Sequence, residues 1–164
     1  MHKKSTQWVL KNFNHHLSSG LNKSQLNRLS LLAILHDIGK ITISSDILTK
    51  PDKLTEEEWQ LLKKHPEKGH KIVSASEKFA IIAEEILYHH EYYNGNGYPE
   101  GLTGEEIPFL ARIIAIVDAY DVMTTGRPYQ DAMSKQKVLK EIKSCAGTQF
   151  DPKLAEEFVE MMSE

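Results

Sequence analysis

The stretch HHEYYNGNGYP, residues 89–99, places two adjacent histidines and a glutamate at the end of a predicted helix. Gly95, Gly97 and Pro99 follow within a few residues, and glycine and proline at this density predict a turn. Two neighbouring imidazoles at a helix end can face one point where the backbone turns. We interpret the stretch as half of a metal site, rather than one core and one solvated histidine, because other candidate ligands occur along the chain.

The composition is that of an ordinary globular protein. The chain has 164 residues, of which 40% are hydrophobic and 26% charged, and a chain of this length can bury a sizeable core. We therefore predict one domain over residues 1–164. The formal net charge of −3 argues against a DNA or RNA polymer as partner, because such binding requires a surplus of lysine and arginine.

Cysteine content and hydropathy limit the compartment. Cys145 is the only cysteine, which excludes an internal disulfide and a thiolate zinc site and favours a reducing cytoplasm. The N-terminal residues lack an apolar run of signal-peptide length, and no stretch approaches the roughly 20 apolar residues of a membrane span. We expect a cytoplasmic chain without membrane contact.

Apolar residues recur at helical spacing throughout the chain, and no alternating strand pattern is present. Thr55 and Glu58 have the spacing of a capping box, and Asn22, Ser134 and Asp151 stand at further helix starts. We predict an all-α, single-domain helical bundle. Its helices are expected over residues 5–17, 22–36, 55–65, from 66, 76–89, from 108 and including 112–123, from 134, and from 151.

Six candidate metal ligands lie at helix ends or on apolar helix faces, where a charged or imidazole group is costly to bury unless it is paired or ligated. Asp118, within the most apolar helix, is either a structural acceptor or a ligand. A set without thiolate suits iron, manganese, zinc or nickel, and six groups exceed what one tetrahedral ion takes. The candidates are His36, Asp37, His65, His89, His90 and Asp118.

This donor set predicts phosphoester hydrolysis. Two divalent ions about 3.5 to 4 Å apart hold a water whose pKa falls toward roughly 7, which makes a bridging hydroxide nucleophile. Lys40 and Arg127 lie just beyond ligand positions, where a phosphate on the metals would need cationic partners. We expect these two side chains to contact phosphate.

At this point several motifs, in order along nearly the whole chain, resemble those of the HD-GYP branch of the HD phosphohydrolase superfamily. The resemblance implies an α-helical domain that hydrolyses cyclic di-GMP to linear pGpG or GMP at a centre of two or three iron or manganese ions. The motifs are HDIGK (36–40), HPEKG (65–69), HHE (89–91) with NGNGYP (94–99), VDAYD (117–121), RPY (127–129) and FDP (150–152).

The resemblance also implies roles for single residues. Asp37 matches the bridging, catalytic carboxylate. One metal would take His65, His89 and His90, and the other would take His36 and Asp118. Lys40, also catalytic, and Arg127 match phosphate contacts, and Tyr98 lies in the loop that shapes the substrate pocket.

Three positions depart from the family pattern. Lys4 stands where the family usually places a further histidine on the first helix, and His2 is two residues out of register. Asn94 replaces a common aspartate, which keeps the turn but loses an anion. Gln130 replaces an arginine or lysine, which removes a cation near the second phosphate.

These departures leave three functions open. The first is a working cyclic di-GMP phosphodiesterase with two divalent ions, iron or manganese. The second is a weak or inactive module that binds metal, nucleotide or a partner such as a GGDEF-type diguanylate cyclase domain. The third is a phosphohydrolase of another nucleotide. The HD, HHE and GYP motifs favour the first, and we also expect that the chain is an excised or N-terminally shortened domain.

Overall fold

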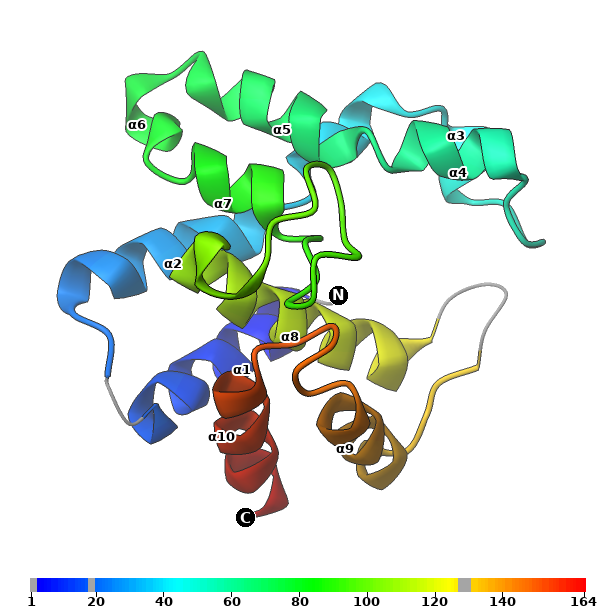
Figure 1. Ribbon diagram of the computed structural model, residues 1–164. Coiled ribbons are helices and arrows are strands. Elements are labelled where there is room, and N and C mark those ends of the chain that lie inside the picture. The colour runs from blue at the N-terminus through cyan, green and yellow to red at the C-terminus, as the bar shows by residue number, and fades with distance from the viewer. Residues whose placement is uncertain (1–2, 18–19, 127–130) are drawn as a thin grey trace.

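A computed structural model of the chain describes residues 3–17, 20–126 and 131–164, with side chains from Val9 onward, and within these ranges it is a bundle of helices without a β-sheet (Figure 1). The all-α prediction is confirmed. In chain order the elements are α1 (Lys3–His16), α2 (Lys23–Leu35), η1 (Ile38–Thr42), α3 (Ser45–Leu48), α4 (Glu56–Leu62), α5 (His65–Ser74), α6 (Glu77–Ala80), α7 (Ala83–Tyr88), η2 (Gly104–Glu106), α8 (Phe109–Thr125), α9 (Lys135–Ser144) and α10 (Pro152–Ser163).

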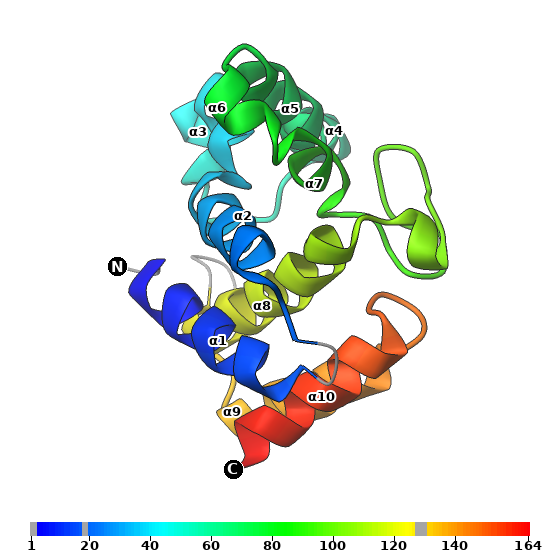
Figure 2. The ribbon, with the colours of Figure 1, turned by 90° about the vertical axis from the view of Figure 1, so that its left-hand side faces the viewer.

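Helix α8 is the axis of the fold. It contacts α1, α2, α7, α9 and α10, and Figure 2 shows it passing between α2 and α7 on one side and α9 and α10 on the other. A helix that is apolar on all faces must be covered on all sides. Its first half is covered in this way, since Ile113, Ile114, Ile116 and Val117 are fully buried. From Asp118 onward the side chains are partly exposed, so the second half opens toward solvent.

The core packs α8 against the two ends of the chain. The rings of Phe13 on α1 and Phe158 on α10 meet edge to face with centroids 5.1 Å apart, an arrangement that aromatic pairs favour. Arg112 of α8 donates to the Asp151 carboxylate at 2.6 Å. Asp151 also accepts from the backbone N–H groups of Lys153 and Leu154, so one carboxylate both caps α10 and ties it to α8.

The four predicted helix starts carry the expected N-cap residues. Thr55 and Glu58 form the capping box of α4, and Asn22 caps α2. Ser134 and Asp151 are the N-cap residues of α9 and α10. Within the described ranges, no helix combines the length and apolar content that crossing a bilayer requires.

Three helix boundaries differ from the prediction. The helix expected over residues 55–65 ends at Leu62, and α5 begins at His65 rather than Pro66. The single helix expected over residues 76–89 is two helices, α6 and α7, with a break at Ile81 and Ile82. These two β-branched residues have reduced helix propensity, and the break leaves Ile82 fully buried while Ile81 is 54% exposed. Pro108, expected as a first helical residue, is instead the N-cap of α8.

Candidate metal centre

Four predicted ligands meet where helix ends converge. Asp37 is the N-cap of η1, His65 opens α5, and His89 is the C-cap of α7 with His90 directly after it. Each offers one ligand atom, and these four atoms lie within 4.8 Å of one another. Such a cluster fits the coordination shell of one cation.

Gly39 allows the HD turn to reach His65. Helix η1 packs on α5, and a Cβ built on Gly39 would overlap the backbone carbonyl of His65 and crowd the backbone nitrogen of Gly69. A residue with a side chain at position 39 would force the two backbones apart. Gly39 therefore brings Asp37, two residues earlier, against the start of α5.

The rings of His65 and His89 are each oriented by a backbone carbonyl. The Nδ1 atom of His65 lies 2.8 Å from Leu62 O, and the Nδ1 atom of His89 lies 2.7 Å from Ile86 O. A carbonyl can only accept, so we assign the N–H of each ring to Nδ1, and in the neutral ring Nε2 then carries a lone pair. The two Nε2 atoms lie 3.3 Å apart. Two lone pairs facing each other repel, and a cation between them removes that repulsion.

Asp37 uses its two oxygens differently. Its Oδ1 lies 3.3 Å from Nε2 of His65, and its Oδ2 accepts from the Lys40 ammonium at 2.6 Å and lies 3.7 Å from Nε2 of His36. Burial alone would raise the pKa of this carboxyl. A hydrogen bond from His65, available when Nε2 of that ring carries a proton, and the charges of His36 and Lys40 hold the pKa well below the usual range. Asp37 is therefore an anion with one oxygen directed to each side of the cluster.

His36 and Asp118 form the other side of the cluster. The His36 Nε2 atom lies 3.5 Å from Asp118 Oδ1, and both ring nitrogens of His36 are buried without a hydrogen bond. Burial lowers the pKa of His36, but the carboxylates of Asp118 and Asp37 outweigh it, so the net shift is upward. Two anions beside buried, unsatisfied ring nitrogens are an environment that favours a cation.

His89 and His90 are neutral in this environment. Burial lowers the pKa of His89 well below its ordinary value and that of His90 to about 3, and repulsion from neighbouring histidines adds to the effect. Metal ligation requires the unprotonated imidazole. The residues present therefore fit a divalent cation by their charge and by the lone pairs they direct inward.

The GYP loop is fixed to the cluster by Glu91, whose role was not predicted from the sequence. Glu91 is 3% exposed and accepts from the backbone N–H groups of Glu100 at 2.7 Å and Gly101 at 3.0 Å. A Cβ on Gly97 would overlap the backbone of Glu91 and Tyr92, so the loop passes directly over this acid. The sequence signal for Glu91 was its place directly after two candidate ligands and directly before a glycine-rich loop.

Tyr98 lies against the cluster. Its ring stacks on that of His90 with centroids 5.0 Å apart, and its N–H donates to His90 O. Asn94 keeps the turn, since its side-chain oxygen accepts from Asn96 N at 3.1 Å. Arg127 and Gln130 lie outside the described residues, as do His2 and the side chain of Lys4.

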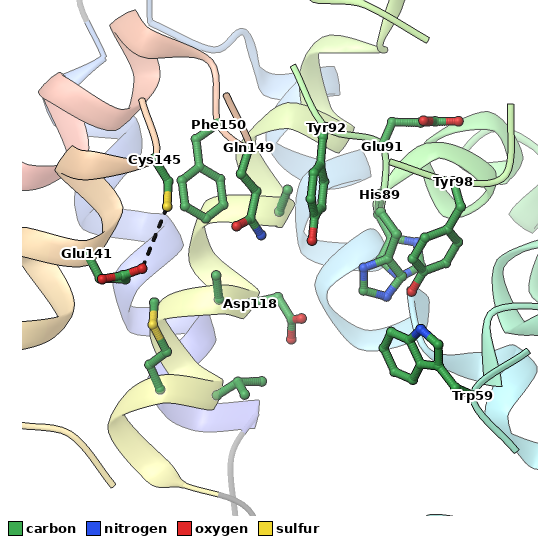
Figure 3. Close-up of a pocket in the computed structure, with 15 residues that line it drawn as sticks. Trp59, His89, Glu91, Tyr92, Tyr98, Asp118, Glu141, Cys145, Gln149 and Phe150 are labelled. Carbon is green, nitrogen blue, oxygen red and sulfur yellow. Dashed lines mark hydrogen bonds between the residues drawn. The ribbon is translucent and has the colours of Figure 1, made fainter. Parts of the chain in front are cut away.

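Three pockets open on the cluster. One runs from Trp59, Tyr98 and His89 past Asp118 to Glu141 at its opposite end (Figure 3). A second is lined by Lys40 together with Asp37, His65, His90 and again Trp59, and a third lies beside His36. Lys40 thus reaches the cluster through its contact with Asp37. Trp59, which helical spacing alone did not mark as functional, borders two of the three pockets.

Known proteins resemble this chain in sequence. A model of the HD domain family matches residues 4–154. The cyclic di-GMP phosphodiesterase response regulator RpfG of Xanthomonas campestris is 41% identical over 136 residues, 82% of this chain and 36% of that protein. A cyclic di-GMP phosphodiesterase of Thermotoga maritima is 37% identical over 147 residues, 88% of this chain and 40% of that protein. The 3'3'-cGAMP-specific phosphodiesterase 2 of Vibrio cholerae is 37% identical over 147 residues, which are 88% of this chain and 28% of that protein.

Solved structures share the fold. A cyclic GMP-AMP specific phosphodiesterase of V. cholerae (V-cGAP3) superposes with a TM-score of 0.76 at 21% identity, over 99% of this chain and 44% of that one. Bd1817, an HDG"Y"P protein from Bdellovibrio bacteriovorus, superposes with a TM-score of 0.77 at 21% identity, over 99% of this chain and 52% of that one. The chain spans two fifths or less of the three sequence relatives described above.

Proposed function

Because the chain belongs to the HD domain family, we propose that it is a metal-dependent phosphodiesterase acting on a cyclic dinucleotide, with cyclic di-GMP as the first candidate substrate and linear pGpG or GMP as product. The observation that carries the proposal is the position of Asp37, whose two oxygens face His65 on one side and His36 on the other. A carboxylate placed in this way suits a bridge between two cations.

We assign two divalent ions to the cluster. Asp37, His65, His89 and His90 would hold one, and His36 and Asp118 would hold the other and share Asp37. Nitrogen and oxygen donors without thiolate suit iron or manganese. When bound, the ions supply Lewis-acid activation of water and neutralise charge on the phosphate.

The chain's own residues have separate tasks in this proposal. Asp37 holds the two sides of the cluster in register. The Lys40 ammonium, held at 2.6 Å by Asp37, gives a cation at the pocket wall for a phosphate oxygen. Tyr98, stacked on His90, would hold that imidazole in place and line the pocket beside it. Arg127 remains a proposed phosphate contact from the sequence alone.

A specific observation favours a second substrate, 3'3'-cGAMP. Three of the curated relatives, all from V. cholerae, are named as 3'3'-cGAMP-specific phosphodiesterases, at 37 to 39% identity, while RpfG and the Thermotoga protein are named for cyclic di-GMP. Both substrates present a phosphodiester to the same cluster and differ in one purine base. The choice between them therefore concerns the pocket around the cluster.

Lys4, at a position where the HD-GYP pattern has histidine, favours another candidate function. With one donor fewer, the chain would bind metal and nucleotide, or dock onto a diguanylate cyclase domain, without useful turnover. This candidate predicts a full complement of bound metal and a measurable affinity for nucleotide in the absence of product.

The experiment is anaerobic reconstitution with Fe²⁺ or Mn²⁺, followed by incubation with cyclic di-GMP and, separately, 3'3'-cGAMP, with products separated by chromatography. We expect linear dinucleotide or GMP from cyclic di-GMP, and none from the Asp37→Asn variant treated identically. Metal-loaded wild-type protein that converts neither substrate would overturn the enzyme proposal in favour of the binding module.

A further inference from the structure

Trp59 lines two of the pockets that open on the cluster. It borders the pocket that holds His89, His90 and Asp118, and also the pocket that holds Asp37 and Lys40. Figure 3 shows the indole gathered with Tyr98 and His89 at one end of the first pocket. A ligand seated on the cluster therefore has this ring beside it in either direction.

The indole is not explained by packing of the fold. Helix α4, which carries it, has no buried residue. Trp59 itself is half-buried, and within the described residues it belongs neither to the apolar core nor to the side chains packed against that core. A large aromatic side chain is normally placed where it can bury its area. Its position beside the pockets points instead to a ligand.

Helix α4 is nevertheless held firmly. Its start is fixed by the capping box of Thr55 and Glu58, and Glu58 also accepts from the Lys50 ammonium at 2.7 Å. The Lys50–Glu58 pair is partly buried, and the indole of the adjacent residue lines the two pockets. The short helix therefore holds the indole of Trp59 in place.

Lys63 links this ring to the cluster. Its ammonium lies 5.7 Å from the centroid of Trp59, one turn away on the same segment, and 5.5 Å from the centroid of Tyr98. Both distances are within the range of a cation–π contact. Tyr98 in turn stacks on His90. Trp59, Lys63, Tyr98 and His90 form a continuous series of contacts, so the indole has a fixed position relative to the predicted metal site.

From this arrangement we infer that Trp59 is a stacking wall for a purine base of a nucleotide whose phosphate sits at the cluster, with Lys63 as a positioning residue that holds the indole. The inference rests on the proposed function for the identity of the ligand. An aromatic face binds any purine because every base has a π-face. Trp59 therefore adds affinity for a nucleotide over a base-free phosphate, without selecting guanine over adenine.

The test compares GMP with ribose 5-phosphate, which has the same phosphoribose but no base, by titration calorimetry on manganese-loaded protein. We expect wild type to bind GMP about 5- to 100-fold more tightly, the amount that stacking of one base provides. In Trp59→Leu this ratio should fall to near one, while Trp59→Phe should keep most of it. Leu61→Ala changes an exposed apolar residue on the same helix (50% exposed) and should leave the ratio unchanged.

A Trp59→Leu variant that keeps the wild-type ratio, or a wild type that binds both compounds equally, would overturn the inference. A second measurement needs no change at Trp59 and uses indole fluorescence in Trp8→Phe protein, where GMP should quench the emission and ribose 5-phosphate should not. Equal responses would overturn the inference as well. Failure of the proposed function is seen separately, as wild-type protein that does not hydrolyse cyclic dinucleotide.

Discussion

The two sides of the histidine and carboxylate cluster are built differently. On one side, which we call the oriented half, the rings of His65 and His89 are fixed through Nδ1 by backbone carbonyls and direct Nε2 at the same point as Asp37 and His90. On the other side, the open half, His36 has no hydrogen bond on either ring nitrogen and faces Asp118 at 3.5 Å. A ring whose other nitrogen is held by a backbone carbonyl binds metal with less reorganisation, so we expect the oriented half to hold its ion more tightly.

A helix end precedes each of these three histidines, but only two of them use its carbonyl groups. The carbonyls that fix the rings, Leu62 O and Ile86 O, each lie three residues before the histidine in the last turn of α4 or α7. Carbonyls in a last turn lack a partner within their own helix and can accept from a side chain. His36 also follows a helix, α2, but its ring nitrogens find no such carbonyl. A carbonyl from the preceding helix therefore orients His65 and His89 but not His36.

The largest expected effect comes from the residue that both halves share. Asp37→Ala should abolish turnover, a loss of at least about 100-fold in kcat, because it removes the bridge and leaves His65 and Lys40 without their anion. Asp37→Asn, which keeps the shape but not the charge, should lose nearly as much. Steady-state kinetics with circular dichroism as a fold control test this, and near-normal rates in either variant would refute the bridging role.

Removing a ligand from the oriented half should weaken metal binding strongly. In His89→Ala, we expect Mn²⁺ affinity to fall by more than about 100-fold, since loss of a group that only hydrogen-bonds to a ligand already costs about 10- to 100-fold. Titration calorimetry measures the affinity. His70→Ala, on α5 with His65 and outside the lining of the three pockets, is the matched control. Equal affinities in the two variants would mean that the oriented half is not a metal position.

A smaller effect is expected from Lys40, which touches the cluster only through Asp37. Lys40→Ala should lower kcat/KM about 10- to 100-fold, because one charge-assisted hydrogen bond is worth about 1.5–3 kcal/mol, while metal content should stay near the wild-type level. The exposed Lys71→Ala on α5 is the control for charge alone. A Lys40→Ala variant with wild-type kinetics would argue against a phosphate contact there.

The smallest effect is expected from the loop anchor, which supports the cluster without joining it. Glu91→Gln removes the negative charge and replaces the oxygen that is a second acceptor for Gly101 N by an amide nitrogen that can only donate. One neutral oxygen is left for both Glu100 N and Gly101 N. We expect unfolding stability to fall by about 1–3 kcal/mol and the amide protons of Glu100 and Gly101 to exchange faster. The exposed Glu84→Gln on α7 should change neither. Unchanged exchange in Glu91→Gln would show that the carboxylate does not hold the loop.

Local chemistry made much of the fold predictable. The capping pairs at Thr55 and Glu58, and the acid at Asp151, form within a few residues of one another, so sequence spacing alone identifies them. The apolar run of α8 is likewise local. The break at Ile81 and Ile82 was missed because the apolar period continues across it, and only burial of Ile82 against other helices decides where the helix ends.

The site was predictable only in part. The residues that meet were identified from their places at helix ends and on apolar faces. The closeness of Asp37 and His65, however, depends on a backbone contact at Gly39, and contacts between distant segments leave no mark at a fixed spacing. Glu91 acts on backbone groups nine and ten residues later, and Trp59 reaches the cluster through Lys63 and Tyr98. Glu91 belongs to the HHE motif, but neither its backbone partners nor the contacts of Trp59 lie at a spacing that helix rules detect.

The difference between the two halves is tested most directly by counting bound manganese in wild type and in His36→Ala, after equilibration with Mn²⁺ near micromolar free concentration and mass spectrometry of the desalted protein. We predict about two ions per chain in wild type and about one in His36→Ala, because the oriented half keeps all four of its ligand groups. A wild type without bound metal, or a His36→Ala variant that loses both ions, would contradict the account.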